Sequence, residues 1–141
     1  MDGFQAQLDS SHFIYVIPGI PIPLQRHRHN NVGNTWDAQK QNKVRTGIEI
    51  QAQHAHRRFY EGPLHMDIRF YFPIPLRGKR STESWSNRKH CIKPDISNCI
   101  KYIEDVCSKL IFYDDCLIAS IYSEKLYDYE PRTEFYIIEL K

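Results

Sequence analysis

The stretch LHMDIRFYFPIP, residues 64–75, constrains the fold more than any other part of the chain. Two sets of side chains alternate along it, Met66, Ile68, Phe70 and Phe72 in one set and Asp67, Arg69 and Tyr71 in the other. A period of two residues is that of a strand with one buried face. Prolines close the stretch, because proline cannot donate a hydrogen bond to a neighbouring strand. The chain must therefore form a sheet with one covered face.

Three further segments have the composition of strands. Residues 12–19 are short, apolar and rich in β-branched and aromatic residues, and they end in Pro-Gly. Residues 116–127 and 133–140 are predicted to be the last two strands, joined by a turn from Asp128 to Pro131.

Two segments show apolar residues at helical spacing. The first runs from about Asp37 to Tyr60, with Thr35 as its expected N-cap and Gly62-Pro63 as its stop, and its one face at helical intervals is Val44, Ile48, Gln51, Ala55 and Phe59. The second follows Pro94, and its apolar face is Ile96, Ile100, Ile103, Cys107 and Leu110. We therefore predict an α+β (mixed α/β) fold: a single small domain over residues 1–141, with one mixed β-sheet and two main helices packed on it.

The composition is that of an ordinary globular domain. Of the 141 residues, 41% are hydrophobic and 26% are charged, which excludes a disordered chain. No apolar run is long enough to cross a bilayer and the start does not resemble a signal peptide, so we expect a cytoplasmic location without a membrane partner. The four cysteines form no CxxC pair, which argues against a zinc site and favours reduced thiols.

Charge is unevenly distributed along the sequence. Residues 1–93 hold 14 Lys or Arg against 7 Asp or Glu, and residues 94–141 hold 5 against 10. Two basic segments without periodicity account for much of this, residues 21–34 and residues 76–93. A basic first part of the sequence and an acidic last part favour a phosphate-contacting surface beside a carboxylate cluster, although such asymmetry also arises by chance.

The carboxylates that could act together are Asp95 and the adjacent pair Asp114 and Asp115. Carboxylates at short range repel each other, and a hard divalent cation is the usual reason to gather them. Each also has a purely structural interpretation: Asp95 as a helix N-cap, the pair as an ordinary turn. Lys101 could be a solvated lysine, and it could form an exposed ion pair with Asp105.

The spacing of these residues resembles the RusA family of Holliday junction resolvases. The family stretch K-P-D-x-D-N-x-x-K-x-x-x-D, followed by a D-D pair, is matched by Lys93, Pro94, Asp95, Asn98, Lys101, Asp105, Asp114 and Asp115. The likeness extends through Ile118, Lys125 and residues 131–134. It is weaker over residues 1–92.

The resemblance implies an endonuclease that binds four-way, branched DNA as a homodimer and uses Mg²⁺. Carried over residue by residue, it makes Asp95 and Asp115 metal ligands and Asp114 a ligand or its neighbour. Lys101 would offset charge on the scissile phosphate.

One residue departs from the family pattern, because Ser97 stands where the family has a catalytic aspartate. Three interpretations stay open: an active enzyme in which another carboxylate such as Asp67 compensates, an inactivated variant, or a natural member that binds junctions and cuts them poorly. Ser97 is therefore at a candidate catalytic position, where its hydroxyl group lacks the negative charge of the family's aspartate.

We expect DNA contacts from both basic segments and from two motif residues. The candidates are Arg26, Arg28, Arg77, Lys79, Arg80, Arg88, Lys89, Lys93 and Asn98. Trp85 could stack on an unpaired base, and it could equally anchor its own loop. The sequence thus predicts a metal-dependent junction endonuclease, with a branched-DNA-binding protein of weak or lost catalysis as the alternative. A coincidental motif in another nuclease or an RNA-binding domain is a third interpretation.

Overall fold

The sheet observed in the structure has four strands and is mixed, as predicted. The computed structural model describes residues 12–25, 28–29, 35–36 and 39–140. The sheet contains β1 (Tyr15–Pro18), β4 (Leu64–Pro73), β5 (Ile118–Asp128) and β6 (Arg132–Glu139), in the order β1-β6-β4-β5. β6 pairs antiparallel with β1 and β4, whereas β4 and β5 pair in parallel. A second, two-stranded sheet joins β2 (Arg28–His29) to β3 (Thr35–Trp36).

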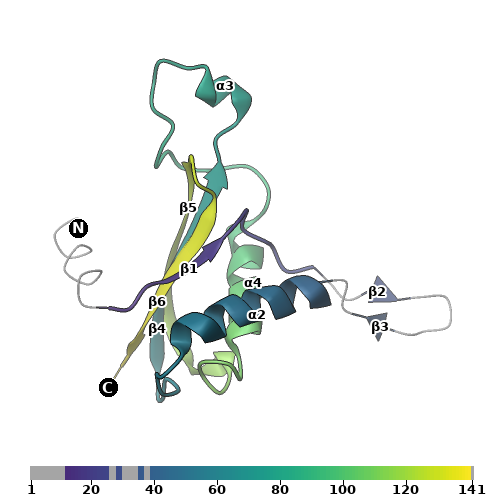
Figure 1. The fold of residues 1–141 in the computed structure, drawn as a ribbon, viewed down its shortest axis with the longest axis vertical. Coiled ribbons are helices and arrows are strands. Elements are labelled where there is room, and N and C mark those ends of the chain that lie inside the picture. The colour runs from purple at the N-terminus through teal and green to yellow at the C-terminus, as the bar shows by residue number, and fades with distance from the viewer. Residues whose placement is uncertain (1–11, 26–27, 30–34, 37–38, 141) are drawn as a thin grey trace.

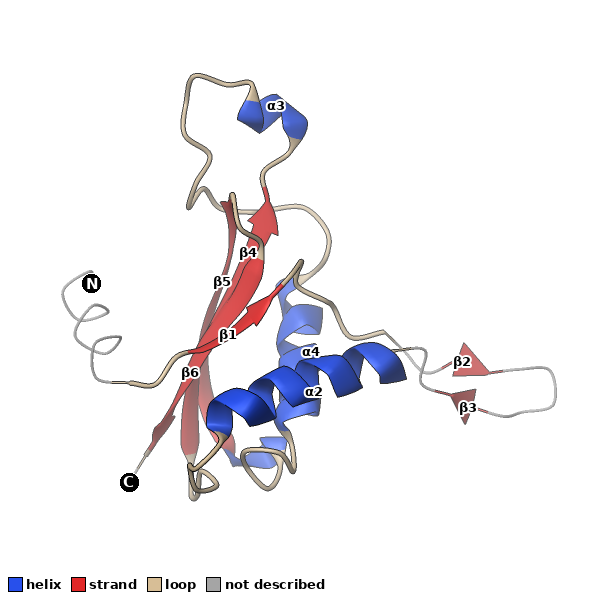
Figure 2. Cartoon of the chain, viewed as in Figure 1, coloured by secondary structure: helices blue, strands red, loops and turns tan. Residues whose placement is uncertain are grey.

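Both main helices lie on one face of the four-stranded sheet (Figure 1). α4 (Ile96–Cys107) connects the parallel strands β4 and β5, so it runs back along the sheet, and α2 (Lys40–His54) crosses over it (Figure 2). The core between the layers is built from the alternate apolar residues of β4 (Met66, Ile68, Phe70 and Phe72), from Phe135 and Ile137 of β6, and from both helices. The predicted α+β class is therefore confirmed.

The first helix is shorter than predicted and uses a different face. Gln39 is its N-cap, without a side-chain capping bond, and Thr35 lies in β3 instead. The helix buries Thr46, Gly47, Ile50 and His54, whereas Val44 and Ile48 are 55% and 60% exposed. A Cβ on Gly47 would lie 3.2 Å from Leu110, so the helix approaches its neighbours through small residues. Apolar periodicity misses a contact of this kind, because glycine and threonine do not count as apolar.

The second helix was predicted more closely. It begins at Ile96 after Asp95 and ends at Cys107, and it buries Cys99, Tyr102, Ile103, Val106 and Cys107. Leu110 lies beyond its end. After the helix the chain passes through a short 3-10 helix, η1 (Asp115–Leu117), into β5. The four cysteines are free, as expected.

Two segments predicted as plain loops contain regular structure. Residues 76–93, called the basic loop below, begin with a short helix, α3 (Leu76–Lys79), and extend beyond the end of the sheet (Figure 1). The polar segment 21–34 contributes β2 and is paired with β3. Within the described residues, no helix has the length and apolar character needed to span a membrane.

A polar cluster is buried where β1 meets the end of α2. The Tyr15 hydroxyl lies 2.8 Å from Nδ1 of His54 and 2.9 Å from the Tyr60 hydroxyl, and Tyr15 itself is fully buried. Burial lowers the pKa of His54, so its ring is neutral near pH 7. Polar groups in a core need such partners, because an unpaired group keeps its desolvation cost.

Removing the hydroxyl group of Tyr15, which bonds both other members of the cluster, should therefore destabilise the fold. We expect Tyr15→Phe to lower the free energy of unfolding by about 1–3 kcal/mol, since it leaves His54 and Tyr60 without their shared partner. Urea titration followed by circular dichroism measures this. Tyr113→Phe is the matched control, because Tyr113 is 69% exposed and should leave the midpoint unchanged. Equal midpoints for the two variants would contradict the role given to the cluster.

Candidate functional site

The start of α4 places the carboxylate of Asp95 at the surface. Asp95 is the N-cap residue with an extended backbone, yet its side chain makes no capping hydrogen bond. Its Oδ1 accepts a hydrogen bond from Nζ of Lys93 at 3.1 Å, and both side chains are exposed. The N-cap position predicted for Asp95 is confirmed, but the carboxylate is not used as a cap. The Asp95 carboxylate is therefore available to bind a cation, or another group that displaces Lys93 from it.

Lys125 of β5 fixes the segment in front of Asp95. Its Nζ donates to the carbonyl oxygens of Ile92 at 2.6 Å and of Pro94 at 2.5 Å. It also lies 6.0 Å from the centre of the Phe72 ring. A charged donor shared by two carbonyls holds the backbone strongly. Lys125 therefore acts on Asp95 through the backbone, as a positioning residue.

The face of α4 turned away from the core carries Ser97, Lys101, Glu104 and Asp105. Ser97, Lys101 and Asp105 are exposed, and Glu104 is half-buried. Residues 97, 101 and 104 share this side because they are four and three positions apart. The sequence also allowed an ion pair between Lys101 and Asp105, but in the structure Asp105 pairs with Lys43 of α2 at 2.9 Å.

Asp114 and Asp115 lie just after α4 and interact with each other. Oδ1 of Asp114 accepts a hydrogen bond from the backbone N–H of Cys116 at 3.0 Å, which lowers the pKa of Asp114, and a hydrogen bond from Asp115 lowers it further. The same bond between the carboxyl groups raises the pKa of Asp115, and burial and the charges of Asp114 and Asp105 add to this rise. The two carboxyl groups therefore repel each other when both are ionised, which disfavours the second negative charge. A bound cation would favour the doubly ionised pair.

Glu104 is a member of this site that the sequence analysis did not single out. Burial raises the pKa of its carboxyl group, and the charge of Asp115 raises it too, whereas Lys101 acts in the opposite direction. Glu104 thus stands within electrostatic reach of both Lys101 and Asp115. Its spacing of seven residues from Ser97 was a usable signal, because positions i and i+7 share a helix face.

The structure brings Lys101, Glu104, Asp105, Asp114 and Asp115 together and leaves Asp95 apart. Asp95 precedes Glu104 by nine residues, a rise of about 14 Å along a helix. In the described part of the chain, no group of three or more His, Cys, Asp or Glu side chains is arranged to hold a metal ion. Two neighbouring carboxylates nevertheless fit magnesium, which is usually bound by one or two carboxylates together with substrate phosphates.

Asp67 cannot compensate for Ser97 in this fold. It belongs to the alternate set of β4 residues, so it lies on the sheet face opposite the helices. Its carboxylate is 5% exposed, and it accepts a hydrogen bond from Tyr136 at 3.3 Å and lies 3.5 Å from Arg69. That hypothesis is therefore wrong.

Trp85 anchors the basic loop. Its ring packs edge-on against Tyr127 of β5 at 5.2 Å, and a Cβ on Gly78 would lie only 2.6 Å from it. The guanidinium groups of Arg88 and Arg77 lie 4.4 Å and 5.2 Å from the ring centre. The structure thus favours the anchoring interpretation, and only glycine at position 78 allows the ring so close to the backbone.

The remaining DNA-binding candidates are mostly at the surface. Arg77, Lys79, Arg80, Arg88, Lys89 and Lys93 are exposed, and Asn98 is half-buried. Arg88 pairs with Glu83 at 3.3 Å, and Lys89 pairs with Glu124. The Asn98 carbonyl accepts a hydrogen bond from Leu24 N–H, so its backbone is structural. Arg26 lies outside the described residues, and only the backbone of Arg28 is described.

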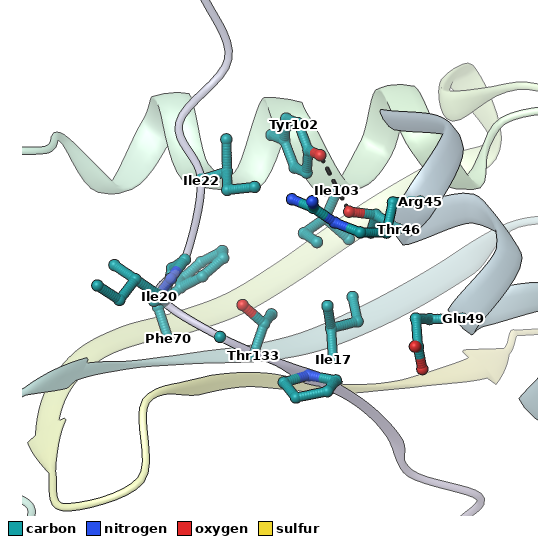
Figure 3. Close-up of a pocket in the computed structure, with 13 residues that line it drawn as sticks. Ile17, Ile20, Ile22, Arg45, Thr46, Glu49, Phe70, Tyr102, Ile103 and Thr133 are labelled. Atoms are coloured by element: carbon teal, nitrogen blue, oxygen red, sulfur yellow. Dashed lines mark hydrogen bonds between the residues drawn. The ribbon is translucent and has the colours of Figure 1, made fainter. Parts of the chain in front are cut away.

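Residues 19–25, called the strap below, separate two hollows in the surface. One is a cavity of about 260 Å³ between the strap, α2, α4 and the sheet (Figure 3). Thr46 and Tyr102 share a hydrogen bond of 3.0 Å in it. The other is an open groove of about 590 Å³, bounded by Lys93 and Pro94, and both hollows are lined by Ile20 and Pro21. Gln39 holds the strap in place, because its side chain bonds the backbone of Gln25 and Pro23 at 2.8 Å each.

A small α+β domain with a basic loop at one end and interacting carboxylates at the other has the features of a nuclease. Comparison with known families agrees: residues 18–138 match the family described as endodeoxyribonuclease RusA. This chain belongs to that family. It is also 29% identical over 96 residues to the uncharacterized protein YqaN of Bacillus subtilis (strain 168), which covers 64% of this chain and 68% of YqaN. The resemblance read from residues 93–140 is therefore confirmed, and the match extends back to residue 18.

The geometry around Lys125 makes a testable prediction. Lys125→Met keeps most of the aliphatic stem but removes the donor to the carbonyls of Ile92 and Pro94. We expect the free energy of unfolding to fall by about 1.5–3 kcal/mol, the usual range for a hydrogen bond to a charged group. Hydrogen exchange at Lys93 and Asp95 should accelerate more than exchange in the sheet.

Lys109→Met is the control, since Lys109 is exposed and lies after the end of α4. Unchanged exchange at Lys93 and Asp95 in the Lys125 variant would show that these bonds do not position the segment.

Proposed function

We propose that this chain is a Holliday junction resolvase, a metal-dependent endonuclease that cuts four-way DNA junctions by paired nicks in recombination and repair. One combined observation carries the proposal. The chain belongs to the RusA family over residues 18–138, and its interacting Asp114–Asp115 pair lies beside an α4 face that carries Lys101.

We propose Asp114, Asp115 and Asp95 as magnesium ligands. Asp114 and Asp115 would act as a pair, with oxygen atoms of the DNA phosphate completing the coordination. Asp95, about 14 Å along the helix from Glu104, would serve a separate ion. When bound, magnesium supplies charge that polarises the phosphodiester and lowers the pKa of an attacking water.

The side chains on α4 have separate tasks in this proposal. Lys101 would offset the charge that develops on the scissile phosphate, since it is exposed and carries its ammonium group on the same side as the carboxylates. Ser97 offers a hydroxyl but no charge. Glu104 would supply the carboxylate that the family has at position 97, because it shares that face and interacts with Asp115.

The DNA would run along α4. The basic loop, which ends at Lys93, leads into the N-terminal end of the helix (Figure 1). In sequence, the Asp114–Asp115 pair follows the C-terminal end of the helix. The helix of 12 residues spans about 18 Å, which corresponds to about five nucleotides of one strand. The exposed cations would neutralise phosphates without reading sequence. Two such subunits in a homodimer would present two sites to two strands, as symmetric cutting of a four-way junction requires.

The alternative function is a dimeric branched-DNA-binding protein with weak or lost catalysis. The observation that favours it is Ser97 itself, exposed on the catalytic face without a charge. The absence of a ready group of three ligand side chains among the described residues is in line with it.

Cleavage of a synthetic four-way junction tests the proposal directly. With Mg²⁺ we expect paired nicks on the junction and none on a linear duplex of the same sequence. We expect EDTA to abolish cutting, and Asp115→Asn to lower its rate by at least about a hundredfold while binding persists, since the ion loses a charged ligand. Asp128→Asn is a control carboxylate, because Asp128 pairs with Arg132 in the β5–β6 turn. Equal rates on junction and duplex would refute the proposal.

Position 97 separates the two functions. If Glu104 compensates, Ser97→Asp should change the cleavage rate by less than about tenfold. Glu104→Gln should lower the rate by at least that factor, because the site loses the charge of one carboxylate. If the chain is a binding protein, Ser97→Asp should raise cutting by orders of magnitude with the junction affinity unchanged. Single-turnover cleavage and gel-shift titration on the same junction measure both quantities.

A further inference from the structure

An open groove lies at the N-terminal end of α4, between the strap and the basic loop. Its volume of about 590 Å³ falls within the range of small-molecule sites, and no Asp or Glu lines it. Five of its lining residues are prolines: Pro21, Pro23, Pro73, Pro75 and Pro94. Proline fixes φ, so the walls are rigid before any ligand arrives.

The inner wall of the groove is aromatic. Phe72 and His90 stack with ring centres 4.0 Å apart and an interplanar angle of 17°, and Tyr127 lies 4.9 Å from His90. His90 is only 7% exposed, and its Nδ1 has no hydrogen-bond partner among the described residues. Burial lowers the pKa of His90, and the charge of Lys125 lowers it further, so the ring is neutral near pH 7. A buried polar atom without a side-chain partner is uncommon in a folded protein.

The rim of the groove is cationic and apolar. Arg77 and Lys93 stand at its edge, and both are exposed. Ile20 and Ile92 are also at the edge and are 58% and 64% exposed. An aromatic wall and two cations at the rim complement a planar heteroaromatic ring that is attached to phosphate.

We propose that this groove binds a nucleobase unstacked at the branch point of the DNA. The base would insert between Ile20 and Ile92 against the aromatic wall, and its flanking phosphates would meet Arg77 and Lys93. Each stacked base adds affinity without reading sequence, which suits a protein selective for DNA shape. This inference rests on the proposed function, because only a branched substrate offers an unstacked base there.

The experiment uses the full chain, EDTA to prevent cutting, and a four-way junction with 5-iodouracil at the branch point. Ultraviolet light should cross-link this base to Tyr127, His90 or Phe72, as mapped by mass spectrometry. The same base within a linear duplex should give no such cross-link. We expect Ile92→Asp to abolish the cross-link and to weaken junction binding by about tenfold or more relative to duplex binding.

Ile48→Asp is the matched control, because Ile48 is 60% exposed on α2 and does not line the groove. It adds the same charge and should leave the ratio of junction to duplex affinity unchanged. Two results would overturn the inference and leave the proposed function standing. One is junction-selective binding with cross-links outside the groove. The other is junction-selective binding in which Ile92→Asp and its control have the same ratio of junction to duplex affinity. No selectivity in the wild type would overturn both. A change from dimer to monomer in Ile92→Asp, seen by light scattering, would show instead that a second copy fills the groove.

Discussion

The parallel pairing of β4 with β5 is the constraint on which the candidate site depends. Parallel neighbours need a crossover, and here α4 supplies it on the face that also carries α2. The crossover brings the start of α4 to the end of β4 and the Asp114–Asp115 pair to the start of β5. A hairpin between these strands would have left no helix to carry Lys101 and Glu104.

Basic and acidic side chains gather at opposite ends of α4. Its N-terminal end lies beside Lys93, Lys125 and the basic loop, and its C-terminal half lies beside Asp115. The basic end is fixed by specific contacts, since Lys125 holds two carbonyls and Trp85 packs over Gly78. The acidic end carries repulsion between Asp114 and Asp115, which raises the pKa of Asp115. A divided surface of this kind suits a polyanion that must be held at one place and cut at another.

The groove beside the basic end has a different physical character from the carboxylate site. It is apolar, rigid through its prolines and bordered by cations, whereas the carboxylate site is exposed and acidic. Binding strength and bond cleavage would therefore be distributed over two regions about one helix length apart. Under the proposed function, such a division would let a chain with Ser97 select branched DNA whatever its cutting rate.

Much of the fold and the residue types of the site could be predicted from the sequence. The alternation in residues 64–75 predicted β4, the apolar spacing after Pro94 predicted α4, and the motif from Lys93 to Asp115 predicted the family. These signals are local, because each depends on a period or spacing within one segment. The tertiary structure alone decided which face of α2 is buried, since Gly47 packs closely only when Leu110 is opposite it. It also placed Glu104 beside Asp115, because that relation depends on how the chain packs after α4 and not on any spacing along the chain.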